Sequence, residues 1–278
     1  MKIGVQIRPT DDSIHPAEMA RMVEAAGLES LFFPEHTHIP LATESLEPES
    51  PGWLETCMHM LDPFVALMAA AGVTERLLLG TGVSLVTQHD PIVLAKEVAT
   101  LDRLSGGRFL FGLGAGWNEP EMRHHGVDPA RRWARAREHV LAMKALWTEE
   151  RAEFHGQFVD FGPSFQWPKP LQPPHPPVLI AGEGPRVLER VIEFGDGWMP
   201  NDFPQVDERV AELAGRLATL GRPPLPVTVY SCDWDRPTVE RHAAAGVERC
   251  VFTIAAFDAA GIDLGLRQVA ELTRGLSR

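Results

Sequence analysis

Runs of consecutive apolar residues alternate along the chain with segments in which apolar residues recur every three or four positions. Runs of the first kind predict buried strands, and segments of the second kind predict helices with one apolar face. Eight strand-like runs lie at 2–7, 30–33, 76–86, 108–116, 177–182, 197–201, 226–231 and 249–255. Helix-like segments follow them at 16–26, 63–71, 91–104, 129–147, 185–194, 204–220, 237–245 and 263–273.

The order of these elements predicts the fold class. Strands that alternate with helices form parallel sheets, and continuously apolar strands are typical of sheets covered on both faces. Eight such units match an α/β fold of the (β/α)8 TIM-barrel type. A doubly wound open sheet is the alternative, although the first strand–helix turn lacks the glycine-rich dinucleotide-binding fingerprint. We expect a single barrel domain over residues 1–278, with insertions after the second strand and after the fourth helix.

Prolines act as helix starts in this pattern. Proline loses no hydrogen bond at the first helical position, and an aspartate before it can cap the helix. The prolines that open predicted helices are Pro16, Pro63, Pro91, Pro129, Pro185, Pro204 and Pro237. Asp62, Asp90 and Asp128 precede three of them as candidate caps. The 24 prolines of the chain therefore do not indicate a loop-rich protein.

Two connections are longer than the others. Residues 34–62 follow the second strand, on the side of the barrel where such enzymes place their active sites, and we expect an active-site loop there. Residues 150–176 are rich in proline, with an alternating stretch at 154–161 that predicts a small hairpin before an extended segment.

Composition narrows the function class. The 278 residues suit one large barrel or two smaller domains, and the formal charge of −12 disfavours a nucleic-acid partner. No apolar run is long enough to span a membrane, and the N-terminal residues lack the features of a signal peptide. Cys57, Cys232 and Cys250 form neither a metal-spaced pair nor a disulfide framework. We expect a cytoplasmic protein that acts on a small molecule.

Histidines after the second strand are the first candidates for chemistry. His36 and His38 follow residues 30–33, where a histidine can donate a hydrogen bond, move a proton or bind a metal. A solvated loop histidine is the alternative. The His-x-His spacing also fits a metal-dependent hydrolase, but the fifth and sixth strands end without a histidine that could complete the ligand set. We therefore expect no metal in the catalytic site.

Glycines at three strand ends offer room for a ligand. Gly82 interrupts the third strand, as at a bend or beside a flat ligand. Gly112, Gly114 and Gly116 alternate at the end of the fourth strand and leave one face without side chains. A planar ring or a tight barrel corner would each explain that pattern.

The turn after the fifth strand is a candidate anion site. Gly182, Glu183 and Gly184 open the next helix, whose free N–H groups and dipole favour a phosphate. An ordinary strand–helix turn is the alternative for this segment.

Two longer segments resemble a known family. Residues 77–117 contain GTGVSLV, a GGRF motif and GLGAGW, and residues 176–201 read PPVLIAGEGPRVLERVIEFGDGWMPN. Both are similar to the signature stretches of the luciferase-like oxidoreductases, the bacterial-luciferase superfamily of (β/α)8 barrels. The resemblance covers about residues 1–255.

The resemblance implies a flavin or deazaflavin at the carboxyl ends of the strands. The short chain and the Glu35–His36 pair look most similar to the subgroup that uses the deazaflavin coenzyme F420, in which His36 would be catalytic with Glu35 beside it. It also implies a non-prolyl cis peptide between Gly82 and Val83. The positions that match cofactor-binding residues are Gly82, Val83, Gly114, Ala115, Gly116, Asn118, Gly182, Glu183 and Gly184. We expect Arg8, Trp53 and Trp117 to line the substrate pocket.

One departure from the family pattern concerns the substrate. Sugar-phosphate dehydrogenases of the subgroup carry a catalytic carboxylate just after the fourth-strand glycines, where this chain has Trp117. We therefore expect a more apolar pocket, with hydride transfer between F420 and another small organic molecule in a homodimeric enzyme. An FMN-dependent monooxygenase of the same family and a non-catalytic carrier or sensor of the cofactor are the alternatives.

Overall fold

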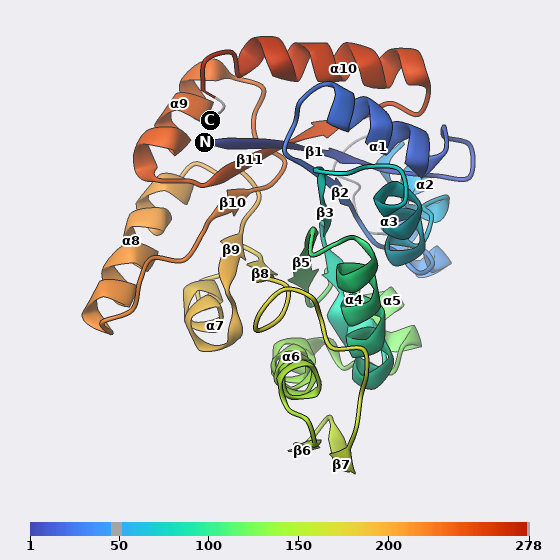
Figure 1. Cartoon of the computed structure of the whole chain (residues 1–278), viewed down its shortest axis with the longest axis vertical. Coiled ribbons are helices and arrows are strands. Elements are labelled where there is room, and N and C mark those ends of the chain that lie inside the picture. The colour runs from blue at the N-terminus through green and yellow to red at the C-terminus, as the bar shows by residue number, and fades with distance from the viewer. Residues whose placement is uncertain (46–51, 277–278) are drawn as a thin grey trace.

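Eight parallel strands enclose the centre of the computed structural model, which describes residues 1–45 and 52–276 (Figure 1). They are β1 (Lys2–Ile7), β2 (Ser30–Phe33), β3 (Leu78–Thr81), β5 (Phe109–Gly114), β8 (Val178–Ala181), β9 (Gly197–Met199), β10 (Thr228–Val229) and β11 (Arg249–Ile254). Their hydrogen-bonded order is β10-β11-β1-β2-β3-β5-β8-β9. Parallel bridges from Trp198 to Val227 and from Asn201 to Tyr230 join the two ends. The predicted (β/α)8 barrel is confirmed.

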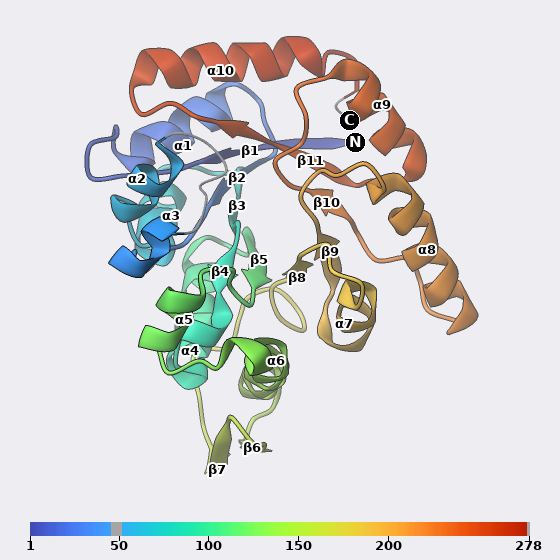
Figure 2. The same ribbon diagram turned by 180° about the vertical axis from the view of Figure 1, so that it is seen from behind.

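Helices cover the outside of the barrel (Figures 1 and 2). They are α1 (Pro16–Ala25), α3 (Pro63–Ala71), α4 (Pro91–Leu104), α6 (Arg132–Thr148), α7 (Val187–Phe194), α8 (Val206–Thr219), α9 (Arg236–Ala245) and α10 (Ala259–Leu272). Asp62 and Asp90 accept hydrogen bonds from the first-turn N–H groups of α3 and α4, as predicted. Pro185 and Pro204 do not open helices, because each lies in a turn two residues before the helix begins. Pro129 opens a 3-10 turn, η3 (Pro129–Arg131), ahead of α6.

Side chains on the two faces of the strands form two cores. The larger core packs the outward faces against the helices and includes the buried residues Phe33, Phe111 and Trp198. A smaller cluster takes one residue from each of six strands or strand ends and fills the barrel interior. Its members are Phe32, Leu110, Leu179, Met199, Tyr230 and Val251. Alternation of inward and outward side chains along each strand explains the separation.

The third predicted strand is interrupted. β3 ends at Thr81, the Gly82–Val83 peptide bond is cis, and β4 (Ser84–Leu85) and the 3-10 turn η2 (Val86–Gln88) follow. The cis peptide that the family resemblance implied is confirmed at this position. A Cβ atom on Gly82 would lie 2.2 Å from the Tyr230 hydroxyl, so only glycine fits here.

The insertions contain structure of their own. The first carries the 3-10 turn η1 (Leu41–Ser45) and α2 (Trp53–Met58), while 46–51 of the predicted loop lie outside the described residues. The second contains the predicted hairpin, in which β6 (Ala152–His155) and β7 (Asp160–Ser164) pair antiparallel. A short helix after β5, α5 (Glu119–His124), was not predicted. Over the ranges described, no helix is both long and apolar enough to cross a membrane.

Candidate active site

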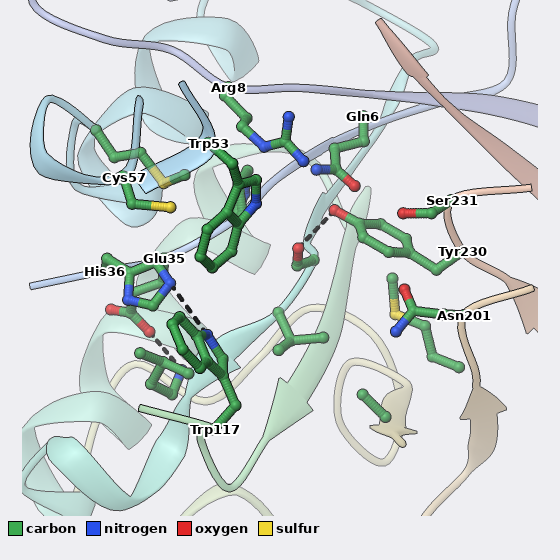
Figure 3. A pocket seen from close by; sticks show the side chains of 17 residues that line it. Gln6, Arg8, Glu35, His36, Trp53, Cys57, Trp117, Asn201, Tyr230 and Ser231 are labelled. Carbon is green, nitrogen blue, oxygen red and sulfur yellow. Dashed lines mark hydrogen bonds between the residues drawn. The ribbon is translucent and has the colours of Figure 1, made fainter. Parts of the chain in front are cut away.

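A cavity of about 320 Å³ opens at the carboxyl ends of the barrel strands (Figure 3). This volume is at the lower end of the range for small-molecule sites, and the location is the one that barrel enzymes use. The structure brings seven predicted site residues together in the lining: Arg8, Glu35, His36, Trp53, Gly82, Val83 and Trp117. Lining residues for which the sequence predicted no role include Gln6, Cys57, Asn201 and Tyr230.

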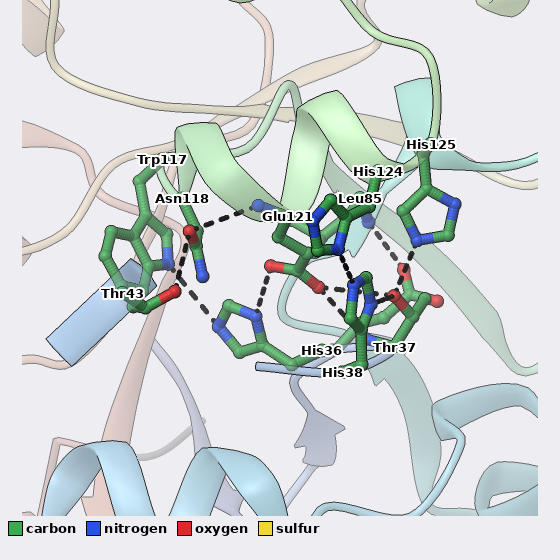
Figure 4. Close-up of polar contacts among 11 residues, drawn as sticks. His36, Thr37, His38, Thr43, Leu85, Trp117, Asn118, Glu121, His124 and His125 are labelled. Carbon is green, nitrogen blue, oxygen red and sulfur yellow. Dashed lines mark hydrogen bonds and ion pairs between the residues drawn. The ribbon is translucent and has the colours of Figure 1, made fainter. Parts of the chain in front are cut away.

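His36 is a buried polar group of the cavity that is anchored by a carboxylate. Its side chain is 6% exposed, and its Nδ1 lies 2.8 Å from Oε2 of the fully buried Glu121 on α5 (Figure 4). Burial opposes the charged imidazole, but contacts with the Cys57 thiol and with Glu121 outweigh it and raise the pKa of His36 to about 9. At neutral pH the site therefore contains an imidazolium, which is an acid and a hydrogen-bond donor.

Two tryptophans flank the imidazole. The His36 ring meets Trp53 and Trp117 edge-on, at centroid distances of 6.2 and 5.7 Å, and the two indoles lie 5.0 Å apart. Trp117 Nε1 is 3.4 Å from His36 Nε2, which is a long contact compared with the one to Glu121. Protonation of Nε2 therefore breaks only the weak hydrogen bond from Trp117. The indoles give the mouth of the cavity an apolar rim.

Glu121 is held from its other side by Thr37. The Thr37 backbone N–H donates to Glu121 Oε1 at 3.1 Å, and the Thr37 hydroxyl lies 2.7 Å from His125 Nε2 and 3.0 Å from His38 Nδ1 (Figure 4). His38 Nε2 is in turn 2.9 Å from Nδ1 of His124. These contacts connect the loop after β2 to the C-terminal end of α5 and keep the Glu121 carboxylate turned towards His36.

Glu35 uses its carboxylate to organise the segment after β3. Its Oε2 accepts hydrogen bonds from the Ser84 hydroxyl, at 2.9 Å, and from the Leu85 N–H, while Oε1 lies 2.7 Å from His89 Nε2. Burial lowers the pKa of His89, but the contact with Glu35 and the charges of Glu35, Glu97 and Asp62 raise it overall. Although Glu35 lines the cavity, these three partners occupy its oxygens. A catalytic role for it stays a prediction.

The face beside the β5 glycines is not open, contrary to one interpretation of their spacing. A Cβ atom on Gly112 would lie 2.2 Å from the Thr81 carbonyl oxygen, and one on Gly114 would lie 2.9 Å from Val83. These glycines let β5 approach β3 and β4 closely, which is the tight-corner alternative. Among the described residues the cavity lining does not include Gly114, Ala115 or Gly116. Their contact with a cofactor stays a prediction.

Asn118 has a structural task that the sequence did not assign. It caps α5, and its Oδ1 accepts hydrogen bonds from the Glu121 N–H and the Thr43 hydroxyl. The Asn118-x-x-Glu121 spacing is that of a capping box, but the Glu121 side chain turns to His36 instead of back to the cap. That spacing was the available sequence signal for Glu121, whose reach could not be predicted.

The predicted anion turn lies beside the cavity. Gly182 has a φ of +113°, and its carbonyl accepts a hydrogen bond from Trp198 Nε1. Glu183 Oε1 accepts from the backbone N–H of Asn201 at 2.7 Å, which turns this carboxylate away from the helix start. Arg209 Nη1 donates to the Glu183 carbonyl at 2.9 Å. Of this turn and its flanks, Ala181 reaches the lining, whereas Gly182, Glu183 and Gly184 do not.

The wall of the cavity opposite His36 contains polar groups that make few hydrogen bonds or ion pairs with other described residues (Figure 3). Tyr230 donates a hydrogen bond to the Gly82 carbonyl, and burial raises its pKa well above 10, so it is a neutral phenol. The buried Oε1 of Gln6 has no hydrogen-bond partner in the described part of the chain. Arg8 likewise makes no ion pair within 1–45 and 52–276. Both point towards the cavity (Figure 3).

Comparison with known proteins identifies the family. The model of the luciferase-like monooxygenase family matches residues 8–232, and the chain belongs to this family. An uncharacterized protein of Mycobacterium tuberculosis is 44% identical over 235 residues, which cover 82% of this chain and 83% of the relative. The F420-dependent glucose-6-phosphate dehydrogenase of Kineococcus radiotolerans is 32% identical over 66% of this chain and 51% of its own. The crystal structure of the monooxygenase RslO1 from Streptomyces bottropensis has a TM-score of 0.81 at 22% identity and covers 98% of both chains.

Proposed function

We propose that the protein is an F420-dependent oxidoreductase that reduces a small organic substrate. The observation that carries the proposal is the His36–Glu121 pair, a buried imidazolium that faces the cavity beside the Gly82–Val83 bend. Hydride addition to an electrophilic carbon leaves an anion on the neighbouring atom, and that anion needs a proton or a hydrogen bond. A group with a pKa of about 9 can supply either at neutral pH.

The chain's own residues fit a flat, polar-edged cofactor. Gly82 and Val83 form a wall without a protruding polar side chain, and the unpartnered Gln6 oxygen offers a hydrogen bond at the edge of the cavity. The turn at 182–184 is next to the lining residue Ala181, and a Cβ atom on Gly184 would meet nothing within 4 Å. This open backbone suits the anionic end of such a cofactor.

Each residue of the cavity has a separate role in the proposed reaction. The bound deazaflavin, in its reduced form, supplies the hydride. Trp53 and Trp117 exclude water from the mouth of the cavity, and His36 donates the proton from Nε2 while Glu121 stabilises the charged ring through Nδ1. Arg8 adds a positive charge that favours a substrate with an anionic group. The substrate gains one hydride and one proton in total.

Cofactor titration tests the proposal directly. Purified protein is titrated separately with F420 and with FMN, and binding is followed by fluorescence quenching. Reduced F420 is then mixed with aldehydes, ketones and enones, with and without a carboxylate, and its reoxidation is followed by absorbance. We expect F420 binding and turnover that favours the carboxylate-bearing members. FMN binding without F420 binding would indicate the monooxygenase, and F420 binding without any turnover would indicate a carrier or sensor.

A further inference from the structure

A second cluster of reactive side chains lies behind the cavity wall. Asp202 follows β9, Cys232 follows β10, and His242 is on α9, and one ligand atom from each lies within 4.8 Å of the other two. Cys232 is 1% exposed and His242 is fully buried. The three residues lie on three different segments of the fold, and only one of them is a cysteine, which explains why cysteine spacing gave no sign of the cluster.

We propose that Asp202, Cys232 and His242 bind a divalent transition metal ion, with Zn²⁺ as the natural occupant. A thiolate, an imidazole and a carboxylate form the mixed donor set that zinc prefers, and three protein ligands leave a fourth position for water. The distance from His242 Nε2 to Asp202 Oδ2 is 3.2 Å. Two nitrogen or oxygen ligands of a tetrahedral zinc ion lie about 3.3 Å apart, so this pair already has the required spacing.

The surroundings orient these three groups. His242 Nδ1 lies 2.7 Å from Asp207 Oδ1 on α8, which leaves Nε2 as the metal-binding nitrogen. A carboxylate on the second nitrogen is the usual outer partner of a zinc-bound histidine. The Asp202 carboxylate accepts a hydrogen bond from the Asp233 N–H at 3.0 Å. The Cys232 N–H donates to the Val251 carbonyl at 2.9 Å, so the backbone on which the thiol is mounted is fixed as well.

Exchange of two protons for the ion would leave the net charge of the cluster unchanged. With a proton on His242 between Asp202 and Asp207 and with Cys232 as a free thiol, the four groups sum to −1. Zn²⁺ displaces one proton from His242 Nε2 and one from the Cys232 thiol, and the sum stays −1. The buried cluster therefore gains no net charge on binding. Arg241, 3.6 Å from Asp207 on the solvent side, and the Cys250 thiol beside Cys232 are the neighbouring titratable groups.

The position of the cluster connects it to the cavity. Asn201 and Ser231 line the cavity, and the residues that follow them, Asp202 and Cys232, face the other way. Backbone hydrogen bonds join the two segments, from the Asp202 N–H to the Tyr230 carbonyl and from the Tyr230 N–H to the Pro200 carbonyl. A metal ion here would fix this wall of the cavity to α9. The proposal of a metal site does not depend on the function proposed above.

Cobalt substitution tests the proposal. Co²⁺ is added to the metal-free full-length protein, both folded and during refolding from urea, so that slow entry into the buried site cannot hide binding. We expect one ion per chain, with the visible bands of tetrahedral Co²⁺ and a thiolate-to-cobalt charge-transfer band. Because two protons leave, affinity should rise by up to about a hundredfold per pH unit while both groups are protonated.

Two matched cysteine variants complete the test. Cys232→Ala should lose the charge-transfer band, whereas Cys250→Ala, which removes the neighbouring buried thiol, should keep it. Far-ultraviolet circular dichroism checks that both variants fold. Folded wild-type protein that shows no charge-transfer band, or a band that persists in folded Cys232→Ala, would overturn the assignment and leave a proton-linked Asp–His–Asp cluster in its place.

Discussion

The protein contains two buried histidines that contact carboxylates. His36 lines the cavity, whereas His242 lies behind the wall that Asn201 and Ser231 form. Burial disfavours the charged ring in both, but contacts with a neighbouring cysteine and with carboxylates outweigh it, and the pKa rises to about 9 for His36 and to about 10 for His242. His36 has one nitrogen on Glu121 and the other towards the cavity, whereas His242 has a carboxylate on each nitrogen. A raised pKa therefore does not distinguish proton transfer from structural support. A ring nitrogen without a carboxylate partner, as at His36 Nε2, distinguishes the two roles.

Replacement of His36 should give the largest effect. In His36→Gln the amide can still donate to Glu121, so the buried carboxylate keeps a partner while the proton donor is lost. We expect kcat to fall about 10²- to 10⁴-fold, the usual contribution of a general acid, with F420 affinity changed less than about tenfold. Steady-state kinetics and fluorescence titration measure the two quantities. His155→Gln, on the exposed hairpin, is the control, and equal turnover in both variants would remove His36 from the mechanism.

His242→Gln should give the opposite pattern. The neutral amide cannot carry the charge that bridges Asp202 and Asp207, and breaking a buried ion pair costs about 3 kcal/mol of unfolding free energy. Urea denaturation in the presence of a chelator measures this cost without a contribution from metal. The kcat of the folded variant should fall far less than that of His36→Gln. A stable His242→Gln protein with abolished turnover would reverse the roles assigned to the two histidines.

The pH dependence of catalysis should separate Glu121 from His36. His36 acts as an acid, so kcat/KM should be level below its pKa of about 9 and fall about tenfold per pH unit above it. Glu121→Gln removes a group that raises this pKa, while the burial that lowers it remains. The pH above which kcat/KM falls should therefore be lower in this variant than in the wild-type protein. For each pH unit by which it lies below 8, kcat/KM at pH 8 should be about tenfold lower. A fall that still begins near pH 9 would exclude Glu121 as the group that sets the charge of His36.

The same titration also affects stability. The folded-state pKa of His36 lies above the ordinary value of 6.5, so its stabilising contribution is complete below about pH 6.5 and is lost as the pH rises to 9. His242 loses its contribution over the range from 6.5 to about 10. In the presence of a chelator, the unfolding free energy of the wild-type protein should therefore decline across this interval, and it should decline less in His242→Gln.

Local sequence patterns were sufficient to predict the barrel and the residues on one side of the candidate active site. Strand and helix periods repeat within short windows, and His36 and Gly82 lie at strand ends that such windows locate. The role of Glu121 could not be predicted, because it depends on α5, a six-residue helix too short to show a helical period, and on the direction in which one side chain turns. The Asp202–Cys232–His242 cluster could not be predicted either, because only closure of the barrel brings its members together.

Tyr230→Phe should give the smallest effect and sharpen the contrast with the histidines. The variant removes the hydrogen bond to the Gly82 carbonyl and leaves that oxygen without its donor, at a cost of about 1 kcal/mol. Thermal unfolding and F420 titration measure the change, which should appear as a slightly weaker cofactor affinity. Because burial holds the pKa of Tyr230 above 10, the phenol stays protonated, and the effect should be the same at pH 6 and pH 9. A pH-dependent loss would show that the hydroxyl acts on the proton of His36 as well as on the wall.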